Sequence, residues 1–123
     1  MEPKYTYRCK LCRVIDGDTI VVDLDLGFGV WLHNQYLRLY GINTPEIRGE
    51  ERPAGLAARR FVIDALAEDA AGDVPGIVID TIKSSNKGKF GRWLAIVWYS
   101  HGVNWTNLND ELVNTGHAEV REY

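Results

Sequence analysis

The sequence predicts an α+β, mainly β fold: a small five-stranded Greek-key barrel with one helix after the third strand and a short C-terminal helix. Extended segments with alternating or β-branched apolar residues cover most of the chain, which is typical of strands. A helical period follows Pro53. With 123 residues, 46% hydrophobic and 25% charged, the chain has the composition of one globular domain, which we expect to span residues 1–123.

The N-terminal third is expected to form three strands. Residues 7–15 are extended in type, and in residues 20–26 apolar side chains alternate with two aspartates, which predicts a half-buried strand. Its predicted apolar face comprises Ile20, Val22, Leu24 and Leu26. The turn at residues 27–29 contains two glycines and leads into a further strand over residues 30–40.

A helix is predicted next, because Pro53 suits a first helical turn. Its predicted apolar face comprises Ala57, Phe61, Val62, Ala65 and Leu66. Residues 71–76 form a connector that is too short to be a domain linker, and strands are predicted over residues 77–82 and 93–99, on either side of a basic loop.

The last predicted element is a short helix that carries Leu108, Leu112 and Val113. Asn107 or a neighbouring residue is suited to cap its N-terminus, and Gly116 is suited to end it. The chain carries three scattered histidines, for which we expect ordinary surface or core roles. They are His33, His101 and His117.

The two cysteines, Cys9 and Cys12, form a C-x-x-C pattern that is found in redox and metal sites. Here the pattern falls on a predicted strand, where an odd separation directs two side chains to opposite faces. No second cysteine pair completes a zinc site. We therefore expect two reduced strand cysteines.

The net charge of −3 argues mildly against a nucleic-acid partner. The distribution of the basic residues favours such a partner, because local basic patches can steer an anionic substrate. The basic residues concerned are Lys83, Lys87, Lys89 and Arg92 in a segment without acids, and Arg38 and Arg48 around a polar motif. No apolar run is long enough for a membrane span, and residues 1–5 lack the apolar region of a signal peptide. A cytoplasmic protein is therefore expected, with a secreted mature form as the alternative.

Two polar stretches organise the chain, at residues 14–19 and 38–46. The second stretch ends a strand at Pro45. Its Arg38 suits bidentate binding of phosphate oxygens. Asn43 is a candidate oxygen ligand for a metal, and Glu46 is a candidate general base. The first, Asp16-Gly17-Asp18-Thr19, adds carboxylates at a bend. An ordinary turn is the alternative for that motif, and its spacing excludes an EF-hand.

Together with Phe90-Gly91-Arg92, these segments resemble the staphylococcal nuclease family, in the same order and over nearly the whole chain. The resemblance implies that the barrel is an OB-fold and that the protein is a Ca²⁺-dependent nuclease acting on DNA and RNA, with single strands preferred. The implied Ca²⁺ ligands are Asp18, Asn43 and the Thr44 carbonyl. The implied catalytic residues are Arg38 and Arg92, which bind phosphate, and Glu46, with Asp16 shaping the metal loop. Lys87, Lys89 and Phe90 are implied to contact nucleic acid.

The chain departs from the family pattern in three places. Asn43 stands where the best-known nuclease has aspartate, which predicts weaker Ca²⁺ binding because one negative charge is absent. Phe90 replaces a tyrosine and lacks its hydroxyl group. The segment that ends at Tyr123 has no clear match to the family's C-terminal helix or base-stacking tyrosines, so reduced base affinity is expected. The alternative function is a catalytically weak or inactive OB module that binds nucleic acid or a protein. A monomer is expected in either case.

Overall fold

The computed structural model describes residues 5–82 and 91–121. The longer strands are β1 (Thr6–Asp16), β2 (Thr19–Asp25), β3 (Trp31–Leu39), β5 (Gly76–Thr81) and β6 (Trp93–Ser100). The short strands are β4 (Ile42–Asn43), β7 (Thr106–Asn107) and β8 (Glu119–Val120). The helices are α1 (Arg52–Leu66) and α2 (Leu108–Asn114), and a 3₁₀ turn, η1 (Gly49–Glu51), leads into α1.

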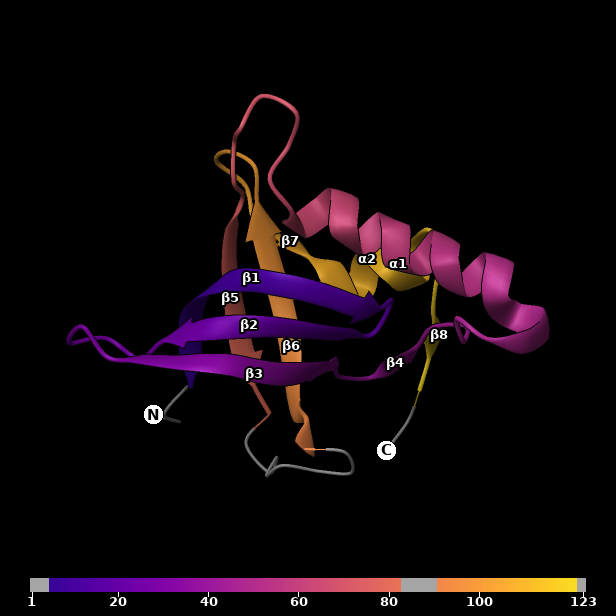
Figure 1. The fold of residues 1–123 in the computed structure, drawn as a ribbon, viewed down its shortest axis with the longest axis horizontal. Helices are drawn as coiled ribbons and strands as arrows, with labels where there is room; N and C mark the ends of the chain where they lie inside the picture. The colour runs from indigo at the N-terminus through magenta and orange to yellow at the C-terminus, as the bar shows by residue number, and fades with distance from the viewer. Residues whose placement is uncertain (1–4, 83–90, 122–123) are drawn as a thin grey trace.

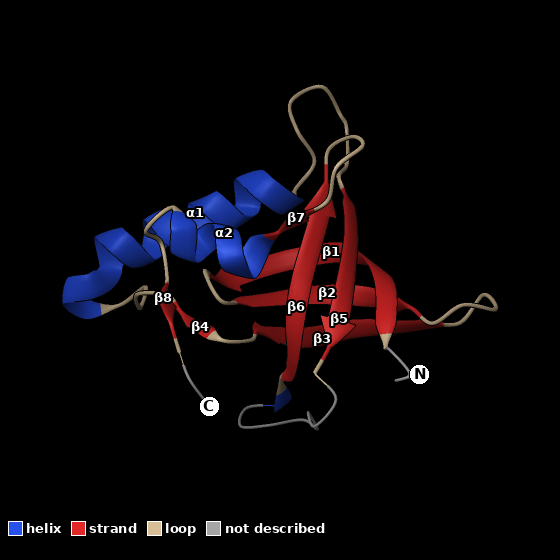
Figure 2. Ribbon diagram, turned by 180° about the vertical axis from the view of Figure 1, so that it is seen from behind, coloured by secondary structure: helices blue, strands red, loops and turns tan. Residues whose placement is uncertain are grey.

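The five longer strands form a closed barrel (Figure 1). Antiparallel pairing joins β3 to β2, β2 to β1, β1 to β5 and β5 to β6, and a parallel pairing of β3 with β6 closes the ring. Both helices lie on the same side of this barrel (Figure 2). The predicted OB-type barrel, with α1 after the third long strand and α2 near the C-terminus, is confirmed.

Strand β2 is more deeply buried than its alternating pattern predicts. Ile20, Val22 and Leu24 face the core as expected, but Val21 on the opposite face is also fully buried. Val21 pairs with Arg13 of β1 and Tyr36 of β3, whose side chains share a 2.6 Å hydrogen bond on that face. The prediction for Leu26 was wrong: it is exposed, because β2 ends at Asp25 and the chain turns there.

Helix α1 packs on the barrel through a face rotated from the predicted one. Its buried residues are Gly55, Ala58, Val62, Ala65 and Leu66. Ala57 is exposed and Phe61 is only partly buried. The Phe61 ring lies tilted against the ring of His117, with 4.9 Å between the ring centroids. Small residues therefore hold the N-terminal half of α1 close to the segments it covers.

Helix α2 begins and ends as predicted. The Asn107 side chain accepts a hydrogen bond from the Asp110 backbone, and Gly116 has φ +82° after the last turn. Buried Asn109 accepts a bond from Val97 N, and its amide nitrogen donates to the carbonyl oxygens of Tyr40 and Ala95. This side chain thus fixes α2 to β6 and to the end of β3.

Cys9 and Cys12 differ in exposure, as expected for side chains on opposite faces of a strand. Cys9 is buried and Cys12 is exposed, both as free thiols. Burial, with a smaller contribution from Cys12, raises the pKa of Cys9 to about 12. Within the described residues, no helix is both long and apolar enough to span a bilayer.

Candidate active site

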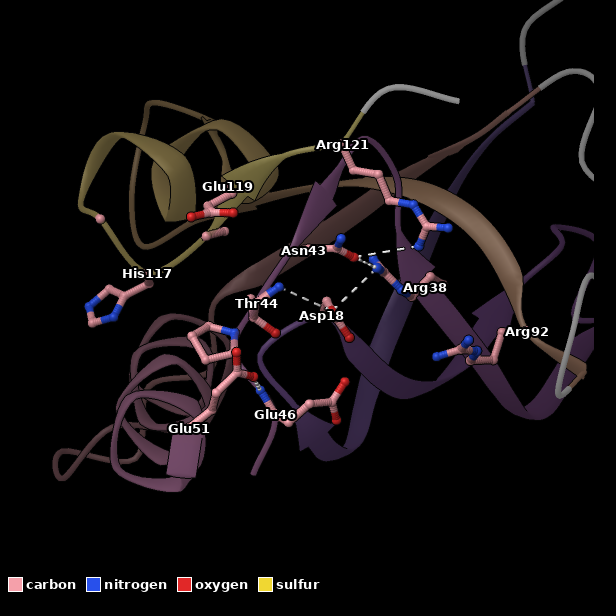
Figure 3. Close-up of a pocket in the computed structure, with 13 residues that line it drawn as sticks. Asp18, Arg38, Asn43, Thr44, Glu46, Glu51, Arg92, His117, Glu119 and Arg121 are labelled. Atoms are coloured by element: carbon pink, nitrogen blue, oxygen red, sulfur yellow. Dashed lines mark hydrogen bonds and ion pairs between the residues drawn. The ribbon is translucent and has the colours of Figure 1, made fainter. Parts of the chain in front are cut away.

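A pocket of about 760 Å³ lies where the β1–β2 turn, the end of β3, η1 and β8 meet (Figure 3). Six of the residues singled out in the sequence line it, namely Asp18, Arg38, Asn43, Thr44, Glu46 and Arg92. Two segments that are distant in the chain therefore converge on one cavity. Asp16 contacts Asp18 beside the pocket. Lys87, Lys89 and Phe90 lie outside the described residues.

The β1–β2 turn places Asp18 at the pocket, and two backbone hydrogen bonds hold it there. The Asp18 backbone N–H donates to Asp16 Oδ1 at 3.1 Å, and its carbonyl accepts from Leu39 N at 2.9 Å. Gly17 is necessary here, since a Cβ atom would lie 2.8 Å from the side chains of both Ala58 and Thr44. The absence of a side chain at residue 17 brings β1, α1 and the Thr44 segment together.

The Asp18 carboxylate is nearly buried and surrounded by donors. Its Oδ2 lies 3.3 Å from both Arg38 Nη2 and the Thr44 backbone nitrogen, and its Oδ1 accepts from Thr19 Oγ1 at 3.2 Å. Burial acts to raise the pKa of Asp18, but the hydrogen bond from Asp16, the Arg38 charge and the bonds from Thr44 outweigh it and hold this pKa below its ordinary value. Asp18 is therefore ionised at neutral pH.

Asp16 shows the opposite shift. Burial, followed by hydrogen bonding to Asp18 and repulsion from its charge, raises the pKa of Asp16 to about 6. Below about pH 6 the two neighbouring carboxyl groups thus hold one proton between them, as expected for like charges at short range. A cation between or beside them would replace that proton and stabilise both carboxylates.

Arg38 is buried, and its guanidinium group binds protein oxygen atoms. Its Nη1 donates to the Leu39 carbonyl at 2.6 Å, and its Nη2 contacts Asp18 and donates to Asn43 Oδ1 at 2.7 Å. Arg121 Nη1 lies 3.5 Å from the same Asn43 oxygen. Asn43 therefore joins two guanidinium groups through one amide oxygen, as the dashed lines in Figure 3 show.

Glu46 is held at the pocket by its backbone. Its N–H donates to Glu51 Oε2 at 2.9 Å, and its carbonyl oxygen lies so close to Gly55 that a Cβ there would be 2.2 Å away. The turn and helix that follow thus clamp Glu46 from two sides. In Figure 3 its side chain extends toward the space beside Asp18.

Arg92 precedes β6 and reaches the pocket from the opposite wall. Its Nη1 donates to Thr19 Oγ1 at 3.2 Å, and Thr19 in turn bonds Asp18. Because β6 pairs with β3 in parallel from Leu37↔Trp93 onward, closure of the barrel brings Arg92 to the same rim as Arg38.

A Ca²⁺ site requires several oxygen ligands from carboxylates, amides, backbone carbonyls or water. Among the described residues, no group of three or more His, Cys, Asp or Glu side chains lies close enough to hold a metal ion, so a site would also need amide or backbone oxygens. The ionised Asp18 carboxylate fits a hard cation. The raised pKa of neighbouring Asp16 agrees with this, because repulsion between the two carboxylates would be relieved by a bound cation. The fit at Asn43 is poorer, because its oxygen already accepts from arginine.

Four pocket residues with polar side chains were not singled out in the sequence. They are Glu51, Glu119, Arg121 and His117, and an ordinary surface or core role was expected for His117. The last three lie around the two-residue strand β8, which pairs Val120 with Ile42 and Glu119 with Asn43. The alternation of polar residues after Gly116 is the only local signal for this strand, and it does not identify the partner.

The barrel and pocket define an OB-fold domain that gathers acids and arginines in a single cavity. The family model described as staphylococcal nuclease homologue matches residues 36–123. The chain therefore belongs to the staphylococcal nuclease family.

Named relatives agree with this assignment. The thermonuclease of Staphylococcus hyicus is 32% identical over 117 residues, covering 93% of this chain and 59% of the relative. The thermonuclease of Staphylococcus intermedius is 32% identical over 114 residues, covering 90% and 58%. An uncharacterized protein of Methanocaldococcus jannaschii is 28% identical over 133 residues, covering 93% and 59%. The chain thus spans about three-fifths of the length of these relatives.

Proposed function

We propose that this protein is a Ca²⁺-dependent nuclease that hydrolyses phosphodiester bonds in DNA and RNA. Water attacks phosphorus, the bond to the 5′ oxygen breaks, and the products carry a 3′-phosphate and a 5′-hydroxyl group. The observation that supports this most is the convergence of Asp18, Arg38, Glu46 and Arg92 on one pocket. Hydrolysis needs charge neutralisation and an activated water, and these side chains supply both.

Each side chain has a separate role in this proposal. Glu46, held by Glu51 and Gly55, accepts a proton from the attacking water. Arg38 and Arg92 bind the non-bridging phosphate oxygens and stabilise the negative charge that develops on them. Asp18, with the Thr44 carbonyl and Asn43, would hold Ca²⁺, which when bound polarises the phosphate and lowers the pKa of nearby water.

The test is a cleavage assay on single-stranded DNA and on RNA, with Ca²⁺ or with a chelator. We expect cleavage that requires Ca²⁺ and that falls by about 100-fold or more in Glu46→Gln, in line with the loss of a general base. Glu50→Gln is the matched control, because Glu50 is an exposed acid in η1 that does not line the pocket. Cleavage that is unaffected by both the chelator and Glu46→Gln would refute the proposal.

A module that binds nucleic acid without cutting it is the second candidate. The observation in its favour is that Asn43, a neutral residue, is bound to Arg38 in a place where a carboxylate would serve the metal better. Retention of an oligonucleotide in Ca²⁺, with intact substrate recovered after long incubation, would support this module over the nuclease.

A further inference from the structure

Strand β8 brings a third arginine to the pocket, beyond the two used above. Val120 of β8 pairs with Ile42 of β4, and the Arg121 backbone N–H donates to the Gly41 carbonyl at 2.8 Å. The side chain of Arg121 lines the same pocket as Arg38 and Arg92. Its place is therefore set by main-chain hydrogen bonds.

The Arg121 guanidinium contacts Asn43 at the wall of the pocket. The Nη1 to Oδ1 distance is 3.5 Å, at the limit of a hydrogen bond, and the acceptor is a neutral amide that also accepts from Arg38 at 2.7 Å. A phosphate oxygen carries charge and binds guanidinium at about 2.8 Å, so it is the stronger acceptor. Asn43 thus holds one nitrogen of Arg121 at the wall of the pocket through a weak acceptor.

The position of Arg121 indicates which phosphate it meets. In the view of Figure 3, Arg38 lies between Arg92 and Arg121, and the Glu119 carboxylate lies on the far side of Asn43 from Arg38. Arg38 and Arg92 serve the scissile phosphate in the proposed reaction. A strand bound along this wall would therefore present a neighbouring phosphate to Arg121.

We infer that Arg121 binds the phosphate next to the scissile one and so positions a polynucleotide strand in the pocket. This inference rests on the proposed function, since it assigns one more contact to the same site. It predicts a preference for chains over substrates with a single phosphodiester bond.

The first experiment measures binding without catalysis. A labelled single-stranded oligonucleotide is titrated in chelator with wild type, Arg121→Ala, Arg121→Lys and Arg60→Ala. Arg60 is the matched control, because it is an exposed arginine of α1 paired with Asp64 at 3.2 Å and does not line the pocket. We expect Arg121→Ala to weaken binding about 10-fold and to reduce the salt slope by about 0.7, with partial recovery in Arg121→Lys. Equal affinities and slopes for Arg121→Ala and Arg60→Ala would overturn the inference.

The second experiment uses kinetics in Ca²⁺ with that oligonucleotide and with a thymidine nitrophenyl ester that has a single phosphodiester. We expect Arg121→Ala to raise KM for the oligonucleotide about 10-fold more than KM for the ester. Equal losses on both substrates would show that Arg121 acts at the scissile phosphate or on the fold, and would overturn the inference. If wild type cleaves neither substrate, the proposed function fails, while the binding experiment still decides the role of Arg121.

Discussion

Substitution of Gly55 tests whether the backbone clamp on Glu46 matters for catalysis. In Gly55→Ala the added Cβ would lie 2.2 Å from the Glu46 carbonyl oxygen, and real Cβ atoms essentially never approach within 3.0 Å, so one of the two segments must move by about 0.8 Å. A displacement of about 1 Å in a catalytic group can lower the rate about 100-fold, or about 2.7 kcal/mol in activation free energy. The helix itself gains about 1 kcal/mol from alanine, which offsets part of the strain.

The assay compares kcat for oligonucleotide cleavage, Ca²⁺ affinity and the thermal midpoint in wild type and Gly55→Ala. We expect kcat to fall about 100-fold with a much smaller change in Ca²⁺ affinity. Gly102→Ala is the control, because no atom lies within 4 Å of a Cβ at that position. A folded Gly55→Ala protein with kcat within about threefold of wild type would refute the positioning of Glu46 by this contact.

Three further predictions concern the metal, pH and stability. Asn43→Asp should tighten Ca²⁺ binding, since a carboxylate charge about 4 Å from the ion contributes up to about 4 kcal/mol. Desolvation of the carboxylate and its pairing with arginine offset part of this gain. Unchanged Ca²⁺ affinity by titration calorimetry would contradict the prediction. Because the pKa of Asp16 is raised to about 6 in the fold, the folded state holds a proton that the unfolded chain has lost. Without Ca²⁺ the contribution of Asp16 to the free energy of unfolding therefore falls as pH rises from about 4 to 6. Asp16→Asn should add about 1 kcal/mol near pH 7.5 and almost nothing near pH 4, by denaturant titration, and equal effects at both pH values would argue against the shift. Asn109→Ala should lower the free energy of unfolding by about 3 kcal/mol, because it leaves buried Val97 N without its acceptor, whereas the exposed-loop control Asn104→Ala should change it little.

The long strands and the caps of α2 were predictable because their signals are local. Alternation of apolar side chains identifies the core face of β2 without knowledge of its neighbours. Likewise, a residue such as Asn107 caps a helix through a donor only three positions away, Asp110 N. The resemblance to a family added the candidate pocket residues, and the structure brings six of them together.

The remaining features depend on packing between distant segments. The buried face of α1 was misjudged because its N-terminal half contains alanines on several sides, so that hydrophobicity alone does not distinguish Ala57 from Ala58. Gly55 is buried in α1 because a backbone passes over it, which no local pattern reveals. The pairing of β8 with β4 depends on two residues in each strand, too few for a periodic signal.

The pairing of β8 with β4 also has a consequence for how the protein is made. Asn43 and Arg121, which meet across the pocket, are 78 residues apart in the chain. During synthesis, the wall that carries both residues cannot form until position 121 has left the ribosome.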